Sequence, residues 1–378
     1  MLRIALSLIL LFSLVACTTN QAPISAQFDA VELLGSTSEG FARAYSPKPF
    51  SFPRDHGPHP AYQFEWWYYT GNLYAGARHF GYQLTFFRSA LSPNAPTRDS
   101  AWGTNQIYMA HLALSDSANE RLYAYERFSR GAAGLAGATG EPFRVFLEDW
   151  SAEGSGPAGM QMHLQAAEGP VALDLNLVSE KPPVLHGEAG LSQKGPTPGN
   201  ASFYYSLSRM ATSGSIMLEG ERHNVSGTSW MDHEWGTSAL EGDASGWDWF
   251  SIQLEDGREL MYAQVRTPTG LSYSFGSLIA TDGQSQALVP EHIELEVLNT
   301  WTSPRSGATY PVGWRLNLRD HAINLEIEPT FNAQELPLSI IYWEGAVRIR
   351  GTQGEQPLSG HGYVELTGYG PQPGGRVR

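Results

Sequence analysis

The chain has 378 residues, more than a single hydrophobic core usually organises, so two domains are expected. Aromatic residues make up 12% of the chain and charged residues only 16%, and with 40 glycines this composition favours many short strands joined by turns over solvated helices. The formal net charge of −14 argues against nucleic acid as a partner, because binding to phosphates requires a basic surface.

Residues 1–17 have the pattern of a secretory signal, in which a basic start precedes an apolar run, Ile4–Val15, that is too short to span a bilayer. The end of this run resembles the lipobox of bacterial lipoproteins. The resemblance implies that Cys17, the one cysteine of the chain, carries a lipid anchor and becomes the mature N-terminus. The protein is then expected in the cell envelope, anchored to the membrane and facing the periplasm. The outer membrane is favoured over the inner one because Thr18, rather than an aspartate, follows the cysteine.

Residues 18–45 show no sustained hydrophobic period, so we expect a flexible tether there. An N-terminal β domain over residues 46–238 and a C-terminal β domain over residues 239–378 are expected to follow. Runs of alternating or near-alternating apolar residues predict the strands of both domains. These runs are Glu65–Leu73, Phe80–Arg88, Ile107–Ser115, Ala172–Val178, Phe203–Met210, Ser215–Leu218, Phe250–Leu254, Leu260–Arg266, Tyr273–Ala280, Ile293–Val297, Trp314–Leu318, Ile323–Ile327 and Tyr342–Arg348.

Two aromatic strands resemble each other and suggest an internal repeat. Residues 66–73 and 247–254 align with aromatic, hydroxyl and leucine positions preserved. Each is followed by a hairpin and by a second strand that ends in an arginine, Arg88 or Arg266. Duplication of a β unit would explain this match and would place the domain boundary near residue 240. Chance similarity between two aromatic strands explains it equally well.

Two further segments have more than one interpretation. Arg127–Ala138 is rich in small residues and is consistent with a short helix or a flexible loop. Asp55–Pro60 contains His56 and His59, whose spacing could begin a metal site, but no cysteine or further His-x-x-His pair accompanies them. We therefore expect no metal, and interpret this segment as a loop that closes or packs against one end of a β-barrel.

The segment Trp230–Gly236 sets three adjacent ionisable residues among tryptophans, and a second aromatic cluster, Trp247–Phe250, follows. A buried carboxylate without a partner shifts toward its protonated form, and a neutral carboxyl beside aromatic faces suits acid chemistry on an apolar substrate. The alternative is that Asp232 and His233 form a hydrogen-bonded pair that holds a turn between strands, with the tryptophans as ordinary core. Glu65 is the second candidate carboxylate. If it faces one cavity with Asp232, the two could divide acid and base work.

Three patterns carry a resemblance to a known family: Asp55-His56-Gly57, the EWWYYTG sequence of residues 65–71, and Asp232-His233-x-x-Gly236 with the tryptophan pair of the second cluster. From about residue 50 to residue 370 the chain resembles the carotenoid 1,2-hydratases, or hydroxyneurosporene synthases, and the related AttH-like lipoproteins. The resemblance implies an all-β fold of two tandem lipocalin-like antiparallel β-barrel domains.

For function, the resemblance implies that a hydrophobic small molecule, an isoprenoid or another lipid, binds in a cavity of this fold. The sequence leaves open whether that cavity lies within one barrel or between the two. Hydratase members add water across a terminal isoprenoid double bond without a cofactor, by proton donation from an aspartate that matches Asp232. His233 and Glu65 are candidates for orienting the acid or the water. AttH-like members are instead associated with ABC transport systems, which would make the chain a non-catalytic lipid-binding accessory lipoprotein. The residues expected to contact the ligand are Trp66, Trp67, Tyr69, Trp235, Trp247 and Trp249.

Overall fold

The computed structural model describes residues 39–94, 99–237, 240 and 243–370. The secretory signal, the lipidation site at Cys17 and most of the tether lie outside the described residues. No helix in the described part of the chain is long and apolar enough to cross a membrane. The short 3-10 helices are η1 (Arg54–His56), η2 (Pro157–Gly159), η3 (Pro290–His292) and η4 (Arg319–His321).

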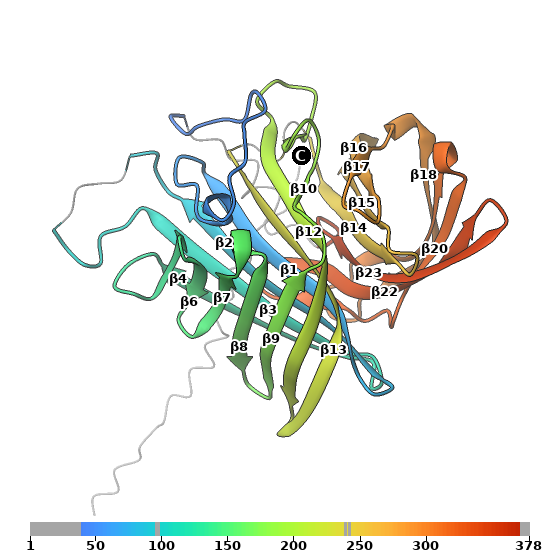
Figure 1. The fold of residues 1–378 in the computed structure, drawn as a ribbon, viewed down its shortest axis with the longest axis horizontal. Helices are drawn as coiled ribbons and strands as arrows, with labels where there is room; N and C mark the ends of the chain where they lie inside the picture. The colour runs from blue at the N-terminus through green and yellow to red at the C-terminus, as the bar shows by residue number, and fades with distance from the viewer. Residues whose placement is uncertain (1–38, 95–98, 238–239, 241–242, 371–378) are drawn as a thin grey trace, which may run out of the picture.

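The N-terminal half forms one antiparallel sheet, which we call sheet A (Figure 1). Its strands are β1 (Phe64–Ala75), β2 (Arg78–Ala90), β3 (Gln106–Asp116), β4 (Arg121–Arg130), β5 (Ala136–Gly140), β6 (Phe143–Leu147), β7 (Trp150–Ser155), β8 (Gln161–Glu168), β9 (Val171–Ser179), β10 (Val184–Leu185), β11 (Leu191–Gln193), β12 (Ala201–Leu218) and β13 (Glu221–Gly236). They run in the order β4-β3-β2-β1-β13-β12-β9-β8-β7-β6-β5, and β10 and β11 also pair with β12. The first strand therefore lies between the second and the last.

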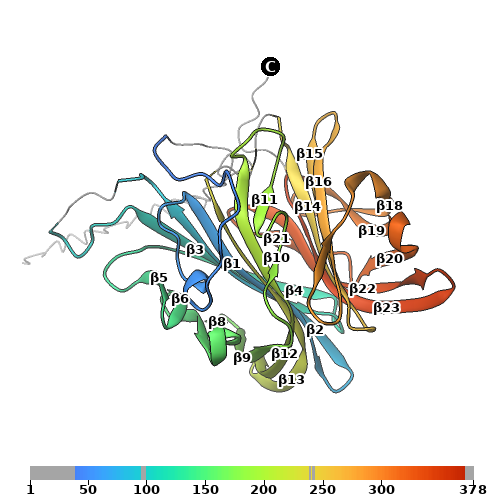
Figure 2. The ribbon, with the colours of Figure 1, turned by 45° about the horizontal axis from the view of Figure 1, so that its top comes forward.

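The C-terminal half forms a second antiparallel sheet, sheet B, seen in yellow to red beside sheet A in Figures 1 and 2. Its strands are β14 (Gly246–Leu254), β15 (Glu259–Thr267), β16 (Gly270–Ile279), β17 (Ser285–Ala287), β18 (Ile293–Thr302), β19 (Thr309–Leu318), β20 (Ile323–Pro329), β21 (Glu335–Pro337), β22 (Ile341–Gln353) and β23 (Gln356–Leu366). Their order is β17-β16-β15-β14-β23-β22-β20-β19-β18, with β21 paired to β22. Here too the first strand lies between the second and the last.

The predicted all-β fold with two barrel-like antiparallel sheets is confirmed. The sequence analysis divided one strand, because Phe203–Met210 and Ser215–Leu218 are both parts of β12, whose pairing with β13 shifts register between Leu207 and Met210. For Arg127–Ala138, the short-helix interpretation is wrong and the loop interpretation holds only for residues 131–135. This segment holds the end of β4 and the start of β5, because edge strands can be built from small and polar residues when they pair on one side.

Burial differs between strands that face one core and strands that face two. β9 alternates between buried and exposed residues, as expected for a strand with one face in solvent. β1 is buried along nearly its whole length. Its Trp67 and Tyr69 point into the core of sheet A, whereas Tyr68 packs in a separate cluster with residues of sheet B. The first strand of sheet A therefore packs on one face against its own core and on the other face against sheet B.

The seam between the sheets combines apolar packing with a buried ion pair. Tyr204 and Trp230 of sheet A pack with Trp249 of sheet B in one buried cluster. At another point of the seam, the buried Glu259 carboxylate of β15 accepts hydrogen bonds from Lys181 Nζ at 2.7 Å and from Arg209 Nε at 2.5 Å. These contacts fix the sheets relative to each other and so shape the space between them.

Candidate functional site

A cavity of about 1020 Å³ lies at the seam and takes its walls from both sheets. Its volume is at the upper end of what small-molecule sites usually provide. Most of the lining is apolar, and the polar groups are few and concentrated. The aromatic and aliphatic lining includes Phe64, Trp66, Tyr68, Phe87, Met109, Tyr204, Trp247, Trp249, Ala263, Val265, Phe275, Ile340 and Tyr342, and the ionisable lining is Glu65, Arg88, His111, Glu126, Lys194, Asp232, Glu234, Arg305 and Glu365.

Asp232 of β13 lines this cavity although its side chain is almost fully buried. Its Oδ1 accepts hydrogen bonds from Trp230 Nε1 at 2.6 Å and from Ser206 Oγ. Its Oδ2 accepts one from Tyr204 Oη at 2.7 Å. Three donors thus converge on this carboxyl. No lysine, arginine or histidine forms an ion pair with it among the described residues.

Burial raises the pKa of Asp232 to about 7, and the nearby Glu234 carboxylate adds to the rise, whereas the three hydrogen bonds act in the opposite direction. A carboxyl with a pKa near neutrality can both hold and release a proton at physiological pH. The three donors are aimed at the charge that would develop as the proton leaves. Asp232 is therefore suited to give a proton to an apolar molecule in the cavity.

The partners of Asp232 are themselves held in place. Tyr204 Oη accepts a hydrogen bond from Trp249 Nε1 at 3.2 Å, which links sheet A to sheet B at the cavity wall. Ser206 Oγ lies 2.6 Å from His186 Nε2, and burial lowers the pKa of that histidine to about 3, so the ring is neutral. The sequence analysis did not single out Tyr204, Ser206 or His186, because they meet Asp232 only through the pairing of β12 with β13.

A second cavity carboxyl, Glu365 of β23, was also missed. It accepts a hydrogen bond from Trp247 Nε1 at 2.8 Å, and this indole is its one hydrogen-bond partner among the described residues. Burial raises the pKa of Glu365 to about 7, with a further contribution from Asp232 and Glu234. Its strand neighbour Glu344 accepts a hydrogen bond from Tyr68 Oη at 2.5 Å, and burial raises its pKa well above the usual range.

One ion pair stands at the cavity wall. Lys194 Nζ lies 2.8 Å from Glu234 Oε1, which also accepts a hydrogen bond from Ser202 Oγ at 2.5 Å. The same ammonium group lies 4.5 Å from the ring centroid of Phe275 and 4.9 Å from that of Tyr204. Glu234 is thus neutralised by a cation, unlike its neighbour Asp232 two residues earlier on the same face of β13.

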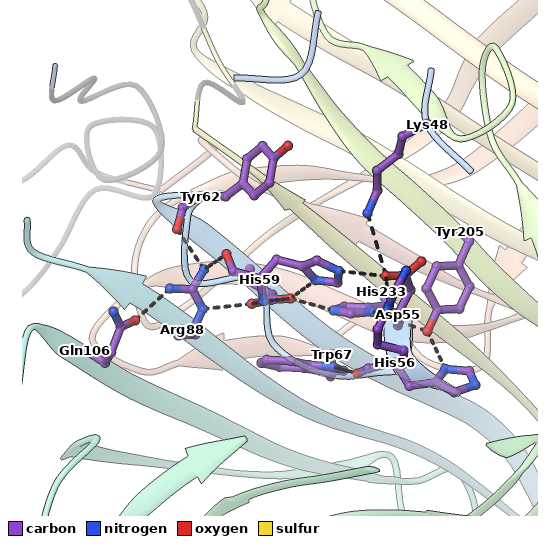
Figure 3. A network of polar contacts seen from close by, with 12 residues as sticks. Lys48, Asp55, His56, His59, Tyr62, Trp67, Arg88, Gln106, Tyr205 and His233 are labelled. Carbon is purple, nitrogen blue, oxygen red and sulfur yellow. Dashed lines mark hydrogen bonds and ion pairs between the residues drawn. The ribbon is translucent and has the colours of Figure 1, made fainter. Parts of the chain in front are cut away.

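His233 and Glu65 belong to a second network, with His59 and Arg88, which runs from the interior of sheet A to the cavity wall at Glu65 and Arg88 (His59, Arg88 and His233 are labelled in Figure 3). His233 Nε2 lies 2.9 Å from Glu65 Oε1, and His59 Nδ1 lies 2.8 Å from the same oxygen. Arg88 Nε donates to Glu65 Oε2 at 2.8 Å. His233 also lies against the ring of Trp67, with centroids 5.0 Å apart. The predicted hydrogen-bonded Asp232–His233 pair is wrong, since neighbours on a strand point to opposite faces and the segment is the interior of β13, not a turn.

Glu65 lines the same cavity as Asp232, as the sequence analysis considered, but it is not suited to act as an acid there. Burial would raise the pKa of Glu65, but the Arg88 guanidinium and the hydrogen bonds to His233 and His59 outweigh it and hold the pKa well below the usual range. Burial lowers the pKa of His233 to about 4. Burial also lowers the pKa of His59, but its hydrogen bonds to Asp55 and Glu65 prevail and raise it. Glu65 thus remains an ionised partner of Arg88, and we assign Glu65 and His233 a structural role.

His59, Glu65 and His233 are also the group whose possible ligand atoms come closest to a metal site, all lying within 4.8 Å of one another. Every one of these atoms already has a partner in the hydrogen-bonded network, and the Arg88 cation lies on the same carboxylate. This donor set is complete without an ion. His56, the other half of the predicted histidine pair, turns away and lies with its Nδ1 2.6 Å from Tyr205 Oη.

The six predicted ligand-contacting aromatic residues divide by strand face. Trp66, Trp247 and Trp249 line the cavity. The other three, which alternate with cavity-facing positions along β1 and β13, are buried in the core of sheet A: Trp67, Tyr69 and Trp235. Side chains alternate between the two faces of a strand, so one known cavity-facing residue predicts which of its neighbours also face the cavity. The sequence alone does not show which face of the strand is turned toward the cavity.

Comparisons with known proteins place this fold among described relatives. A model of the AttH-like family matches residues 43–369. A solved structure from Nitrosomonas europaea, described as an AttH, matches with a TM-score of 0.77 and 33% identity, covering 87% of this chain and 100% of that one. Kievitone hydratase from Nectria haematococca matches with a TM-score of 0.65 and 16% identity, covering 88% of this chain and 97% of that one, which shows a shared fold.

One curated protein, the quinolone epoxide rearrangement protein penF from Penicillium thymicola, is 27% identical over 187 residues. The match covers 44% of this chain and spans 50% of that relative's length. The family match extends over most of the described residues, and the N. europaea structure is covered in full. The AttH part of the resemblance is therefore confirmed, and the chain belongs to the AttH-like family.

Proposed function

We propose that the chain binds a hydrophobic small molecule, an isoprenoid or another lipid, in the cavity between the two sheets and adds water across one of its double bonds by proton transfer from Asp232. The observation that carries this proposal is Asp232 itself, a buried carboxyl with a pKa of about 7 that lines an apolar cavity. A carboxylic acid that is neutral near physiological pH is what protonation of an unactivated double bond requires.

The surroundings of Asp232 suit the steps that follow. Proton transfer to one carbon of the double bond leaves a carbocation on the other carbon and a carboxylate on Asp232. The hydrogen bonds from Trp230, Ser206 and Tyr204 stabilise that carboxylate. The aromatic faces of the cavity wall stabilise the cation until a water molecule adds to it. This step needs no cofactor, and it is the type of reaction that the resemblance to carotenoid 1,2-hydratases implies.

The curated relative supports small-molecule chemistry in this family, since its name describes the rearrangement of a quinolone epoxide. The alternative is a non-catalytic lipid-binding accessory protein of an envelope ABC transport system. The apolar cavity fits that role equally, but a carboxyl with three converging donors and a pKa near neutrality is not needed for it. In either case, we propose that lipidation at Cys17 anchors the protein in the envelope, with the outer membrane favoured.

The test uses lycopene as the probe, with water addition followed by mass spectrometry in heavy-oxygen water and binding followed by quenching of tryptophan fluorescence. Asp232→Asn is expected to lower turnover by about 100-fold or more and to leave the dissociation constant within about threefold, because it removes the proton and keeps the shape. Asp282→Asn, in an exposed turn of sheet B, is the matched control and is expected to keep both.

Three outcomes contradict parts of the proposal in different ways. Full turnover by Asp232→Asn would show that another group is the acid. Binding of the probe without turnover by the unmodified protein would favour the transport role. Failure of lycopene to bind would exclude a long isoprenoid as the ligand of this cavity.

A further inference from the structure

Two of the carboxyls that line the cavity, Asp232 and Glu365, occupy equivalent positions in the two sheets. β1 and β14 contain the two copies of the sequence repeat, and the alignment of these copies places Tyr68 opposite Trp249. In sheet A, Tyr68 is paired with Asp232 on the last strand. In sheet B, Trp249 is paired with Glu365 on the last strand. Asp232 and Glu365 are therefore counterparts, one from each half of the molecule.

The seam brings these counterparts to the same cavity. The rings of Tyr68 and Trp249 meet edge to face, with centroids 5.2 Å apart, and lie at the contact between the two first strands. Residues paired directly across an antiparallel ladder have their side chains on one face of the sheet. The side chain of Asp232 therefore lies on the same face as Tyr68, and that of Glu365 on the same face as Trp249. Both carboxyls line the cavity at the seam.

Although equivalent in position, the two carboxyls differ in their hydrogen bonds. Asp232 receives three donors, one of which, Trp230 Nε1, can only donate. Glu365 receives one, from Trp247, on Oε1. Its Oε2 has no hydrogen-bond partner among the described residues and belongs to a side chain that is only partly buried against the cavity. The three donors stabilise the carboxylate that Asp232 becomes once its proton has been transferred, and the open oxygen of Glu365 can accept a proton from a bound water.

We propose that Glu365 is the base that completes the reaction started by Asp232, and that the two carboxyls share one proton and one negative charge. The inference rests on the proposed function. Asp232 transfers its proton to one carbon of the double bond, the oxygen of a water molecule bonds to the other carbon, and Glu365 takes a proton from that water. At the end the alkene has gained one water, Asp232 is ionised and Glu365 is protonated. Proton transfer from Glu365 to Asp232 through water restores the starting state.

The electrostatics of the cavity fit one shared charge. Burial raises the pKa of both carboxyls to about 7, and the Asp232 charge is among the causes for Glu365. Like charges in one site cannot both ionise without a large cost, so the protons leave in two coupled steps. The other titratable or charged groups that face this pair are Glu234 with Lys194, Glu344, Tyr68, Tyr204 and His186.

The experiment measures the coupling directly in the complete chain. Infrared difference spectra of the carboxyl stretching bands, recorded from about pH 5 to about pH 9, give the titration of each group, with Asp232→Asn and Glu365→Gln identifying the bands. Glu365→Gln is expected to lower the apparent pKa of Asp232 by about 1 or more, and Asp232→Asn is expected to lower that of Glu365 similarly. Glu328→Gln, on the exposed face of sheet B, is the matched control and should shift neither.

A second measurement separates this inference from the proposed function. With lycopene as the probe, the unmodified protein is expected to show a bell-shaped pH profile, and Glu365→Gln is expected to lower turnover by about 100-fold and to lose the acidic limb. Loss of turnover in Asp232→Asn with an unchanged profile in Glu365→Gln would overturn the inference and leave the proposed function intact. An unchanged Asp232 titration in Glu365→Gln would overturn it whether or not lycopene is a substrate.

Discussion

At the scale of the residue, the raised pKa of Asp232 makes the free energy of unfolding depend on pH. Its pKa is about 7 in the folded chain, compared with an ordinary value of 3.8. Because the folded value is the higher one, the carboxyl stabilises the fold fully only below about pH 4, and this contribution is lost as the pH rises through about 7. A site that holds an acid neutral therefore becomes a weak point of the structure at alkaline pH.

This predicts a pH-dependent effect of removing the ionisable group. Relative to the unmodified protein, Asp232→Asn is expected to gain unfolding free energy as the pH rises from about 4 to about 8, by up to about 4 kcal/mol, since each pKa unit corresponds to about 1.4 kcal/mol. Urea unfolding at several pH values measures it. Asp282→Asn, which is exposed, should differ from the unmodified protein by an amount that does not vary over the same range.

Of the carboxyls that line the cavity, the sequence analysis singled out Asp232 and Glu65 but not Glu365, and there is a physical reason for the difference. Asp232 lies between Trp230 and Trp235, and a charged residue in such apolar company is unusual. Glu365 follows Tyr363 and Val364 in a run that is typical of any half-buried strand. Its importance comes from pairing with a strand more than a hundred residues earlier, which local pattern does not report.

At the scale of elements, each first strand is tied to the second by an ion pair from an equivalent arginine, but the carboxylates differ in position. Arg88 lies opposite its partner Glu65, whereas Arg266 lies opposite Gly246 and reaches Asp248. Arg88, at the end of β2, donates to Glu65 of β1 at 2.8 Å. Arg266, near the end of β15, donates to Asp248 of β14 at 2.9 Å. The sequence analysis noted both arginines as ends of the repeated hairpins, and the structure gives them a shared role as anchors of the strand that carries the cavity tryptophans. Many strands were predictable from alternation, but β13 and β23, which carry Asp232 and Glu365, were not among the predicted runs. The faces and the partners of the strands were not predictable either.

The Arg88 anchor is expected to be important for stability because it is buried. Arg88→Met should lower the unfolding free energy by about 3–5 kcal/mol, since it leaves the Glu65 carboxylate buried without its cation. Arg144→Met removes an exposed pair with Glu153 and is expected to cost at most about 1 kcal/mol. Chemical denaturation of both variants compares them. Equal effects would contradict the assignment of the Glu65 network as a structural anchor.

At the scale of the whole molecule, the two sheets are joined by side chains rather than by a shared ladder. In the described residues every strand pairing stays within sheet A or within sheet B. The Glu259 carboxylate, held by Lys181 and Arg209, is a buried ion-pair contact across this seam, and hydrogen bonds such as that from Tyr68 to Glu344 also cross it. The two-fold arrangement was expected from the sequence repeat. Whether the cavity lies within one barrel or between the two was left open by the sequence, because the packing of one sheet on the other is a long-range property.

The substitution Glu259→Gln tests how strongly the ion pair at the seam holds the two sheets together. It leaves two buried cations facing a neutral amide, which is expected to weaken the contact between the sheets by about 3 kcal/mol or more and to split a single thermal unfolding transition into two. Differential scanning calorimetry measures the number of transitions. The matched control is Glu328→Gln, on the exposed face of sheet B, which should keep the transition of the unmodified protein.

A cavity between two separately paired sheets can change width without the loss of any backbone hydrogen bond. In a cavity enclosed by one barrel, the number of strands limits the diameter. Here the separation depends on side chains such as Lys181 and Arg209, which lie on the seam and do not line the cavity. Substitutions there can thus alter the size of molecule that fits while the carboxyls stay unchanged, so that selectivity and chemistry are free to diverge independently among proteins with this architecture.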